Sequence, residues 1–228
     1  SKRSTARMER LRERLYRGMA DRGITGEVAD EIYMKMRAFA NYGFPESHSV
    51  SFAYLVYASS WIKHHEPAAF CAALINAQPM GFWSPHTLVR DARRHGVEVR
   101  TPDLHVSLAG ATLEEEGSVV RLGLSSVRGL GSSLAESVVV ERERGGGFAS
   151  MEDLVRRVPD LDIAHLEAMA TAGVFGESLD LERREAIWSA GAASRSRPGT
   201  LPGIVTGDRA PRLPGMTPVE ESVADLWA

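Results

Sequence analysis

The stretch from Leu124 to Val139 reads LSSVRGLGSSLAESVV, and it decides the fold. It places a glycine, an apolar residue and a second glycine at Gly129, Leu130 and Gly131, with the small Ala135 four residues later. Two glycines let the main chain turn tightly with no Cβ atom in the way, and the free N–H groups at the following helix start attract an anion. This spacing is typical of a helix-hairpin-helix motif.

The motif predicts which residues contact a ligand, and the ligand it indicates is the DNA backbone. Contacts of this kind position a protein on DNA without reading its sequence. The same residues also allow a plain structural turn, which remains the alternative. The predicted DNA-binding residues are Arg128, Gly129, Leu130, Gly131 and Ser132.

A degenerate second copy of the motif follows from Leu166 to Gly176, which reads LEAMATAGVFG. Two residues rather than one separate its glycines, and the acidic Glu177 and Asp180 follow soon after it. Acidic side chains oppose phosphate binding. We therefore expect the second copy mainly to pack against the first.

The remaining periodicity predicts a mainly α chain with one small β element. Apolar spacing ends a first helix near Gly23 and a second near Gly43, and serine 47, 49 or 51 can cap a third. Further helices are predicted at 67–76, 85–95, 132–144, 151–158, 163–172 and 181–190, a β-hairpin at 111–122, and a Gly/Pro-rich linker at 191–216.

Composition limits the class of protein. Lys and Arg total 27 against 30 Asp and Glu, a net charge of −3, so any contact with a polyanion must be local. The clearest basic stretch runs from Lys2 to Arg17. A lone Cys71 excludes an internal disulfide and suits the reducing cytoplasm, where we expect the protein to act. The chain has no long apolar run and no signal peptide, so we expect no membrane partner. Because the chain begins at Ser1 without methionine, we expect a fragment of a longer protein.

Two groups of side chains imitate metal sites. Asp160 and Asp162 are paired carboxylates, but their surroundings are helical and Asp162 is well placed as the N-cap of the helix from Ile163. His64 and His65 are adjacent, so on a helix they point about 100° apart. We predict no metal ligand in this chain.

The stretch from Tyr42 to Ala53, YGFPESHSVSFA, resembles the fingers region of bacterial C-family DNA polymerases of the DnaE type. WIK at 61–63, EPAAF at 66–70, RTPDL at 100–104 and GMTP at 215–218 extend the resemblance over nearly the whole chain. Replicative members usually carry Asn-Lys-Ser-His where this chain has PESH at 45–48, which is closer to the error-prone, damage-inducible branch.

The resemblance implies a fragment of an error-prone DNA-directed DNA polymerase that acts in translesion synthesis and DNA repair. It divides the chain into part of the fingers (1–96), a small β connection (97–123), the tandem helix-hairpin-helix region (124–190), and a linker with the start of the next element (191–228). Mg²⁺-assisted phosphoryl transfer is implied for the intact enzyme. The metal-binding aspartates of the family belong to the palm, before residue 1, so this chain should be inactive alone and hold no catalytic residue.

The resemblance also implies contacts with the incoming deoxynucleoside triphosphate, carried over to Lys2, Arg3, Ser47 and His48. A triphosphate needs cations together with hydroxyl or N–H donors, and these residues supply them. The implied partners are primer-template DNA, nucleotides, other translesion proteins and the sliding clamp. A non-enzymatic helix-hairpin-helix module of a repair complex, and the replicative paralogue, remain the alternative assignments.

Overall fold

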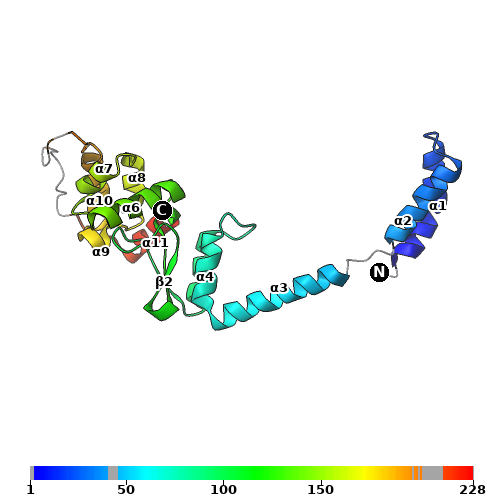
Figure 1. Cartoon of the computed structure of the whole chain (residues 1–228), viewed down its shortest axis with the longest axis horizontal. Coiled ribbons are helices and arrows are strands. Elements are labelled where there is room, and N and C mark those ends of the chain that lie inside the picture. The colour runs from blue at the N-terminus through cyan, green and yellow to red at the C-terminus, as the bar shows by residue number, and fades with distance from the viewer. Residues whose placement is uncertain (1–2, 41–45, 197, 200, 202–212, 228) are drawn as a thin grey trace. The chain divides into compact units, whose positions relative to one another are not determined.

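The computed structural model describes residues 3–40, 46–196, 198–199, 201 and 213–227 (Figure 1). The protein is mainly α, as predicted, with one three-stranded sheet within the described residues. Two compact units make up the chain: residues 1–61 and residues 62–228.

The first unit is built on two helices, α1 (Arg3–Ala20) and α2 (Gly26–Ala40). Between them Gly23 adopts φ +77°, the left-handed conformation that glycine takes without strain. Met19 and Tyr33 are buried between the helices, and the Tyr16 hydroxyl donates a 2.7 Å hydrogen bond to Asp30. Apolar residues at helical spacing thus hold this pair together.

The third helix, α3 (Glu46–His65), starts earlier than the sequence pattern predicted. Ser47, Ser49 and Ser51 all lie inside α3, so none of the three predicted candidates is its N-cap. Residues 46–65 contain no Gly or Pro that would interrupt the helix.

The second unit begins with α4 (Pro67–Asn76) and α5 (Pro85–Arg94), both at their predicted positions. Ser84 is the N-cap of α5, and its hydroxyl accepts a 3.4 Å hydrogen bond from the Thr87 N–H. Each helix carries proline in its first turn, where the missing N–H donor costs nothing. Local signals therefore fix both helices.

Three short strands form the sheet in the order β1-β3-β2. β2 (Thr112–Glu114) and β3 (Val119–Arg121) pair antiparallel, which confirms the predicted hairpin. β1 (Glu98–Arg100) lies parallel to β3 on its other side. α4 packs on β2 and β3, α5 packs on β1, and the buried side chains between them include Cys71, Val99 and Val120.

The rest of the second unit is a helical bundle (Figure 1). A 3₁₀ turn, η2 (Leu124–Ser126), leads into α6 (Gly131–Gly145), α7 (Met151–Arg157), α8 (Ile163–Thr171), α9 (Gly176–Leu179) and α10 (Arg183–Ala193). α9 was not predicted because four residues are too few to show a period. α10 continues to Ala193, and α11 (Pro218–Trp227) follows, whereas residues 202–212 of the predicted linker lie outside the described residues.

Candidate DNA-binding site

The hairpin between η2 and α6 has the backbone that its two glycines predict. Gly129 adopts φ +85° and Gly131 φ +66°, both in the left-handed region that costs other residues about 1 kcal/mol or more. Leu130 between them is only 3% exposed and anchors the hairpin to the core. The buried Leu130 side chain therefore fixes the turn to the core, while the two glycines are exposed to solvent.

The start of α6 presents backbone donors to solvent. Leu130 stands at the N-cap position, and its apolar side chain cannot accept a hydrogen bond from the first turn. Gly131 and Ser132 are exposed there, beside the exposed Arg128. A Cβ atom built on Gly129 or Gly131 would meet nothing within 4 Å among the described residues. The N–H groups of this turn are open to an anion, and the helix dipole adds to the attraction.

A close backbone contact holds the hairpin's entry in place. The N–H groups of Leu124 and Ser125 donate 2.9 Å hydrogen bonds to the carbonyls of Leu108 and Ala109. Gly123 lies so near this loop that a Cβ atom on it would come within 2.3 Å of the Ala109 oxygen. The sequence pattern missed Gly123, because the requirement comes from a segment more than ten residues away.

The second copy of the motif is packed rather than open, as expected. Val174 and Phe175 are fully buried in the same core as Leu130, and the Val174 carbonyl accepts a 3.0 Å hydrogen bond from the Leu104 N–H. Gly173 has φ +78°, but a Cβ atom there would lie 3.0 Å from Arg183 Nε. The second copy therefore packs in the same hydrophobic core as Leu130 of the first copy.

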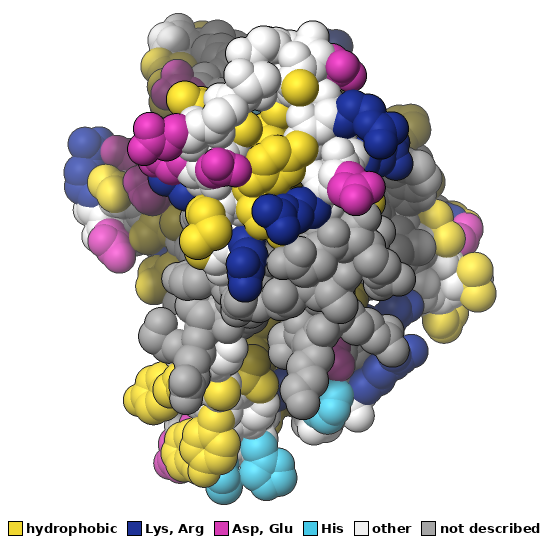
Figure 2. All heavy atoms as spheres, turned by 90° about the vertical axis from the view of Figure 1, so that its right-hand side faces the viewer, with side chains coloured by type: hydrophobic (Ala, Val, Ile, Leu, Met, Phe, Trp, Pro, Cys, Tyr) yellow, Lys and Arg dark blue, Asp and Glu magenta, His cyan; other side chains and the backbone are white. Residues whose placement is uncertain are grey.

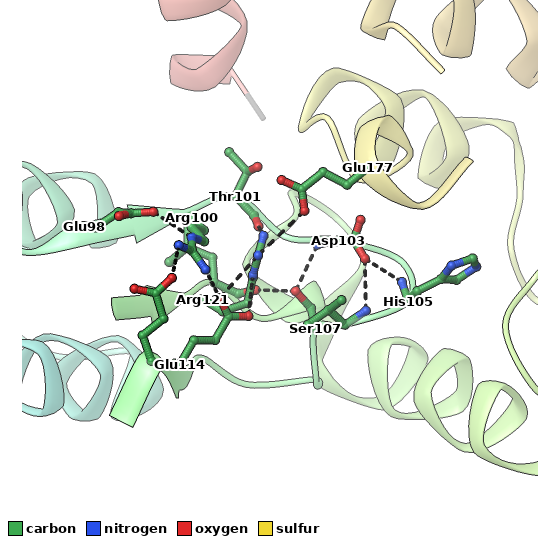
Figure 3. Close-up of polar contacts among 12 residues, drawn as sticks. Glu98, Arg100, Thr101, Asp103, His105, Ser107, Glu114, Arg121 and Glu177 are labelled. Carbon is green, nitrogen blue, oxygen red and sulfur yellow. Dashed lines mark hydrogen bonds and ion pairs between the residues drawn. The ribbon is translucent and has the colours of Figure 1, made fainter. Parts of the chain in front are cut away.

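The buried side chain of Arg121 links β3 to Glu177 of α9, which follows the second copy of the motif (Figure 3). Arg121 is 5% exposed; its Nε donates to Glu114 at 2.9 Å, its Nη1 donates to the Thr101 carbonyl at 2.9 Å, and its Nη2 lies 3.8 Å from Glu177. Hydrogen bonds from Arg121 and then Arg100 lower the pKa of Glu114. Because the arginines of this network are engaged by carboxylates, we assign it a structural role.

Of the residues predicted to contact a nucleotide, Arg3 belongs to α1, and Ser47 and His48 belong to α3. Lys2 is outside the described residues, and the side chains of Arg3 in α1 and Ser47 in α3 are not described. His48 is exposed on α3, with its ring edge-on to Phe52 at 4.5 Å between centroids. Nucleotide binding by these four residues stays a prediction.

The carboxylate pair that imitates a metal site includes a helix cap. Asp162 Oδ1 accepts a 2.9 Å hydrogen bond from the His165 N–H, and His165 Nδ1 accepts one of 3.2 Å from the Asp162 N–H. This capping box confirms the predicted role of Asp162. Within the described residues, no group of three His, Cys, Asp or Glu side chains is placed to hold a metal ion.

Charge on the surface is mixed. On the face drawn in Figure 2, basic and acidic side chains are interspersed, with apolar side chains exposed among them. Any polyanion must be bound by a local arrangement such as the hairpin.

None of the helices in the described parts of the chain is both long enough and apolar enough to cross a membrane.

Comparison with known proteins gives the same motif and a family. A family described as helix-hairpin-helix motif matches residues 96–186. The whole chain is 58% identical to the error-prone DNA polymerase of Nocardia farcinica and 57% identical to that of Mycolicibacterium paratuberculosis, covering 20% and 21% of those proteins. The error-prone DNA polymerase of Corynebacterium efficiens is 51% identical, again over the whole chain.

The chain thus spans about a fifth of the length of the curated relatives it matches. The relative from Nocardia farcinica is more than half identical to this chain and matches it over its whole length. This agrees with the resemblance that the motifs at 42–53 and 124–139 carry. The chain is therefore a homologue of one segment of the error-prone DNA polymerases, and its residues 96–186 match the helix-hairpin-helix family.

Proposed function

We propose that this chain holds duplex DNA by its backbone within an error-prone DNA-directed DNA polymerase. The observation that carries the proposal is the open hairpin: two left-handed glycines, anchored by the buried Leu130, present the N–H groups of an uncapped helix start to solvent. Phosphate is the ligand that such a turn binds. The names of the relatives supply the enzyme class.

The intact enzyme would add deoxynucleotides opposite a template, including past damage. In it, Lys2, Arg3, Ser47 and His48 would contact the incoming triphosphate, and the sliding clamp and other translesion proteins would be partners in the cytoplasm. Mg²⁺ would assist phosphoryl transfer in such an enzyme. The described residues of this chain offer it no set of ligands, and we assign none to it.

Binding of the 228-residue chain to duplexes of unrelated sequence tests the hairpin. Replacing Gly129 and Gly131 by Ala should weaken binding about tenfold to a hundredfold, since hydrogen bonds to a charged group contribute about 1.5–3 kcal/mol. The loss should be equal across sequences, because only phosphates are contacted.

Gly117→Ala is the matched control. Gly117 also has a positive φ and open space around its Cβ position, but it lies in the β2–β3 turn. Equal weakening by this control would show that strain, and not the hairpin, explains the loss. Unaltered affinity of the Gly129/Gly131 variant would refute the proposal.

A further inference from the structure

A cleft of about 910 Å³ opens between α5 and the start of the hairpin motif. One wall is α5, from Pro85 to Arg94, and the other includes Thr101, Leu122 and Val127. The second copy of the motif contributes Ala172 to the lining. The hairpin's open turn does not itself line this cleft, so the cleft is a second surface of the same unit.

The α5 wall is basic. The α5 residues that line the cleft recur every fourth position along the helix, in two rows, and one row consists of His86, Arg90 and Arg94. Arg90 and Arg94 are exposed, whereas Arg93 is held by a 2.9 Å hydrogen bond to the Val99 carbonyl. The described residues that line the cleft include no carboxylate. The cleft therefore attracts an anion that two arginines can contact together.

Two aromatic side chains stand at the other end of α5. Phe82 is 99% exposed and Trp83 60% exposed, immediately before the N-cap Ser84. The Gln78 side chain holds this loop, because it donates to the Trp83 carbonyl at 3.2 Å and accepts from the Met80 N–H at 3.1 Å. Exposed apolar surface of this kind, when it is contiguous, marks an interaction site.

The cations of the cleft, together with the aromatic pair in the loop that leads into α5, match the chemistry of a single DNA strand, although Phe82 and Trp83 do not themselves line the cleft. Proteins that bind single strands combine a basic groove along the backbone with aromatic rings on which bases stack. The ten residues of α5 span about 15 Å, enough for a few nucleotides between Trp83 and Arg94. Apolar lining residues such as Ile75 and Val89 suit the faces of unpaired bases, which a duplex keeps inside its stack.

We propose that the α5 cleft binds single-stranded DNA, with Arg90 and Arg94 contacting phosphates inside the cleft and Phe82 and Trp83, in the loop before α5, stacking on bases outside it. This deepens the proposed function and rests on it for the class of ligand. The hairpin and the cleft then have separate tasks: the hairpin holds duplex, and the cleft holds an adjoining unpaired strand.

Binding of a short oligothymidylate and of a duplex to the whole chain, each titrated with salt, tests the proposal. Phe82→Ala with Trp83→Ala should weaken oligothymidylate binding about tenfold or more, since each stacked base contributes about that much. Arg90→Gln with Arg94→Gln should reduce the slope of log affinity against log salt by about 1.4, which corresponds to two phosphates of a single strand. Duplex affinity should fall far less in both variants.

A matched control and a spectroscopic signal complete the experiment. Arg144→Gln with Arg195→Gln removes the same charge from exposed positions that do not line the cleft, and should leave the slope unchanged. Oligothymidylate should quench tryptophan fluorescence, and Trp83→Phe should abolish most of the quenching while keeping the affinity. Circular dichroism of each variant checks that it is folded.

The outcomes separate this proposal from the proposed function. If the Gly129/Gly131 variant loses duplex binding but the cleft variants bind oligothymidylate normally, the cleft proposal is overturned and the hairpin proposal stands. Equal losses in the Arg144/Arg195 control overturn the cleft proposal as well. If cleft variants lose oligothymidylate binding while the glycine variant keeps duplex binding, the hairpin proposal fails alone. A chain that binds neither DNA overturns both.

Discussion

The backbone of Gly123 lies against the carbonyl group of Gly110, so that a Cβ atom on Gly123 would be 2.3 Å from the Gly110 carbonyl carbon. This contact brings the loop after β1 against the entry of the hairpin motif. Gly123→Ala must push two backbone segments apart, and we expect it to lower the free energy of unfolding by about 1–3 kcal/mol. Chemical denaturation measures the change.

Gly176→Ala is the control for this substitution. Gly176 is the first residue of α9, and a Cβ atom there would meet nothing within 4 Å among the described residues. Alanine is the better helix former, so this variant should be neutral or slightly more stable. A stable Gly123→Ala variant would mean that the loop and the hairpin entry are not in contact.

Arg121→Met should also destabilise the second unit. Among the described residues, it leaves Glu114 with Arg100 as its one ion-pair partner and removes the link to Glu177 (Figure 3). Loss of hydrogen bonds to a charged group predicts a cost of about 1.5–3 kcal/mol at neutral pH. Thermal or urea unfolding of both proteins gives the difference.

The cost of Arg121→Met should depend on pH with a definite sign. The folded-state pKa of Glu114 lies below its ordinary value of 4.5, so its pairing stabilises the fold above that pH and is lost as the pH falls through the folded pKa. The difference in stability between the wild type and the variant should therefore shrink on acidification. A difference that grows as the pH falls would contradict the role given to this pair.

Asp162→Ala should remove the capping box of α8 and lower stability by about 1 kcal/mol. Asp160→Ala is the matched control, because Asp160 is an exposed carboxylate two residues away. Urea unfolding with and without Mg²⁺ measures both variants. Equal effects of the two substitutions, or a stabilisation by Mg²⁺ that either abolishes, would contradict the capping role.

In an intact polymerase containing this segment, His48→Ala should reduce kcat/KM for nucleotide incorporation. Loss of a hydrogen bond to the charged triphosphate predicts a reduction of about tenfold to a hundredfold. His64→Ala, which alters an exposed histidine near the other end of α3, should have little effect. Steady-state incorporation measures both, and equal kinetics of the His48 variant and the wild type would remove it from the nucleotide site.

Features with local causes could be predicted from the sequence. Proline in the first turn set the starts of α4 and α5, and the glycines of the hairpin set the turn before α6. Asp162 was identified as a cap from its position alone. In each case, the interacting residues are within about four positions of one another.

Features with distant causes could not be predicted. The parallel pairing of β1 with β3 joins segments far apart in the sequence. The Asn76 side chain, at the end of α4, also bonds both the N–H and the carbonyl of Ala111, just before β2. The pairing of Arg121 with Glu177 and the cleft beside α5 likewise join segments far apart in the sequence. The predicted start of α3 was wrong because the serines near its beginning are residues that commonly cap helices.

Backbone amide signals of the isotope-labelled chain, followed during titration with a duplex, test the central claim most directly. If the hairpin holds phosphate through main-chain N–H groups, the amides of Gly129, Gly131 and Ser132 should shift most, and they should saturate together at low salt. The amide of Gly146, at the far end of α6, should stay in place. Duplex binding that leaves the three hairpin amides unmoved would contradict the account.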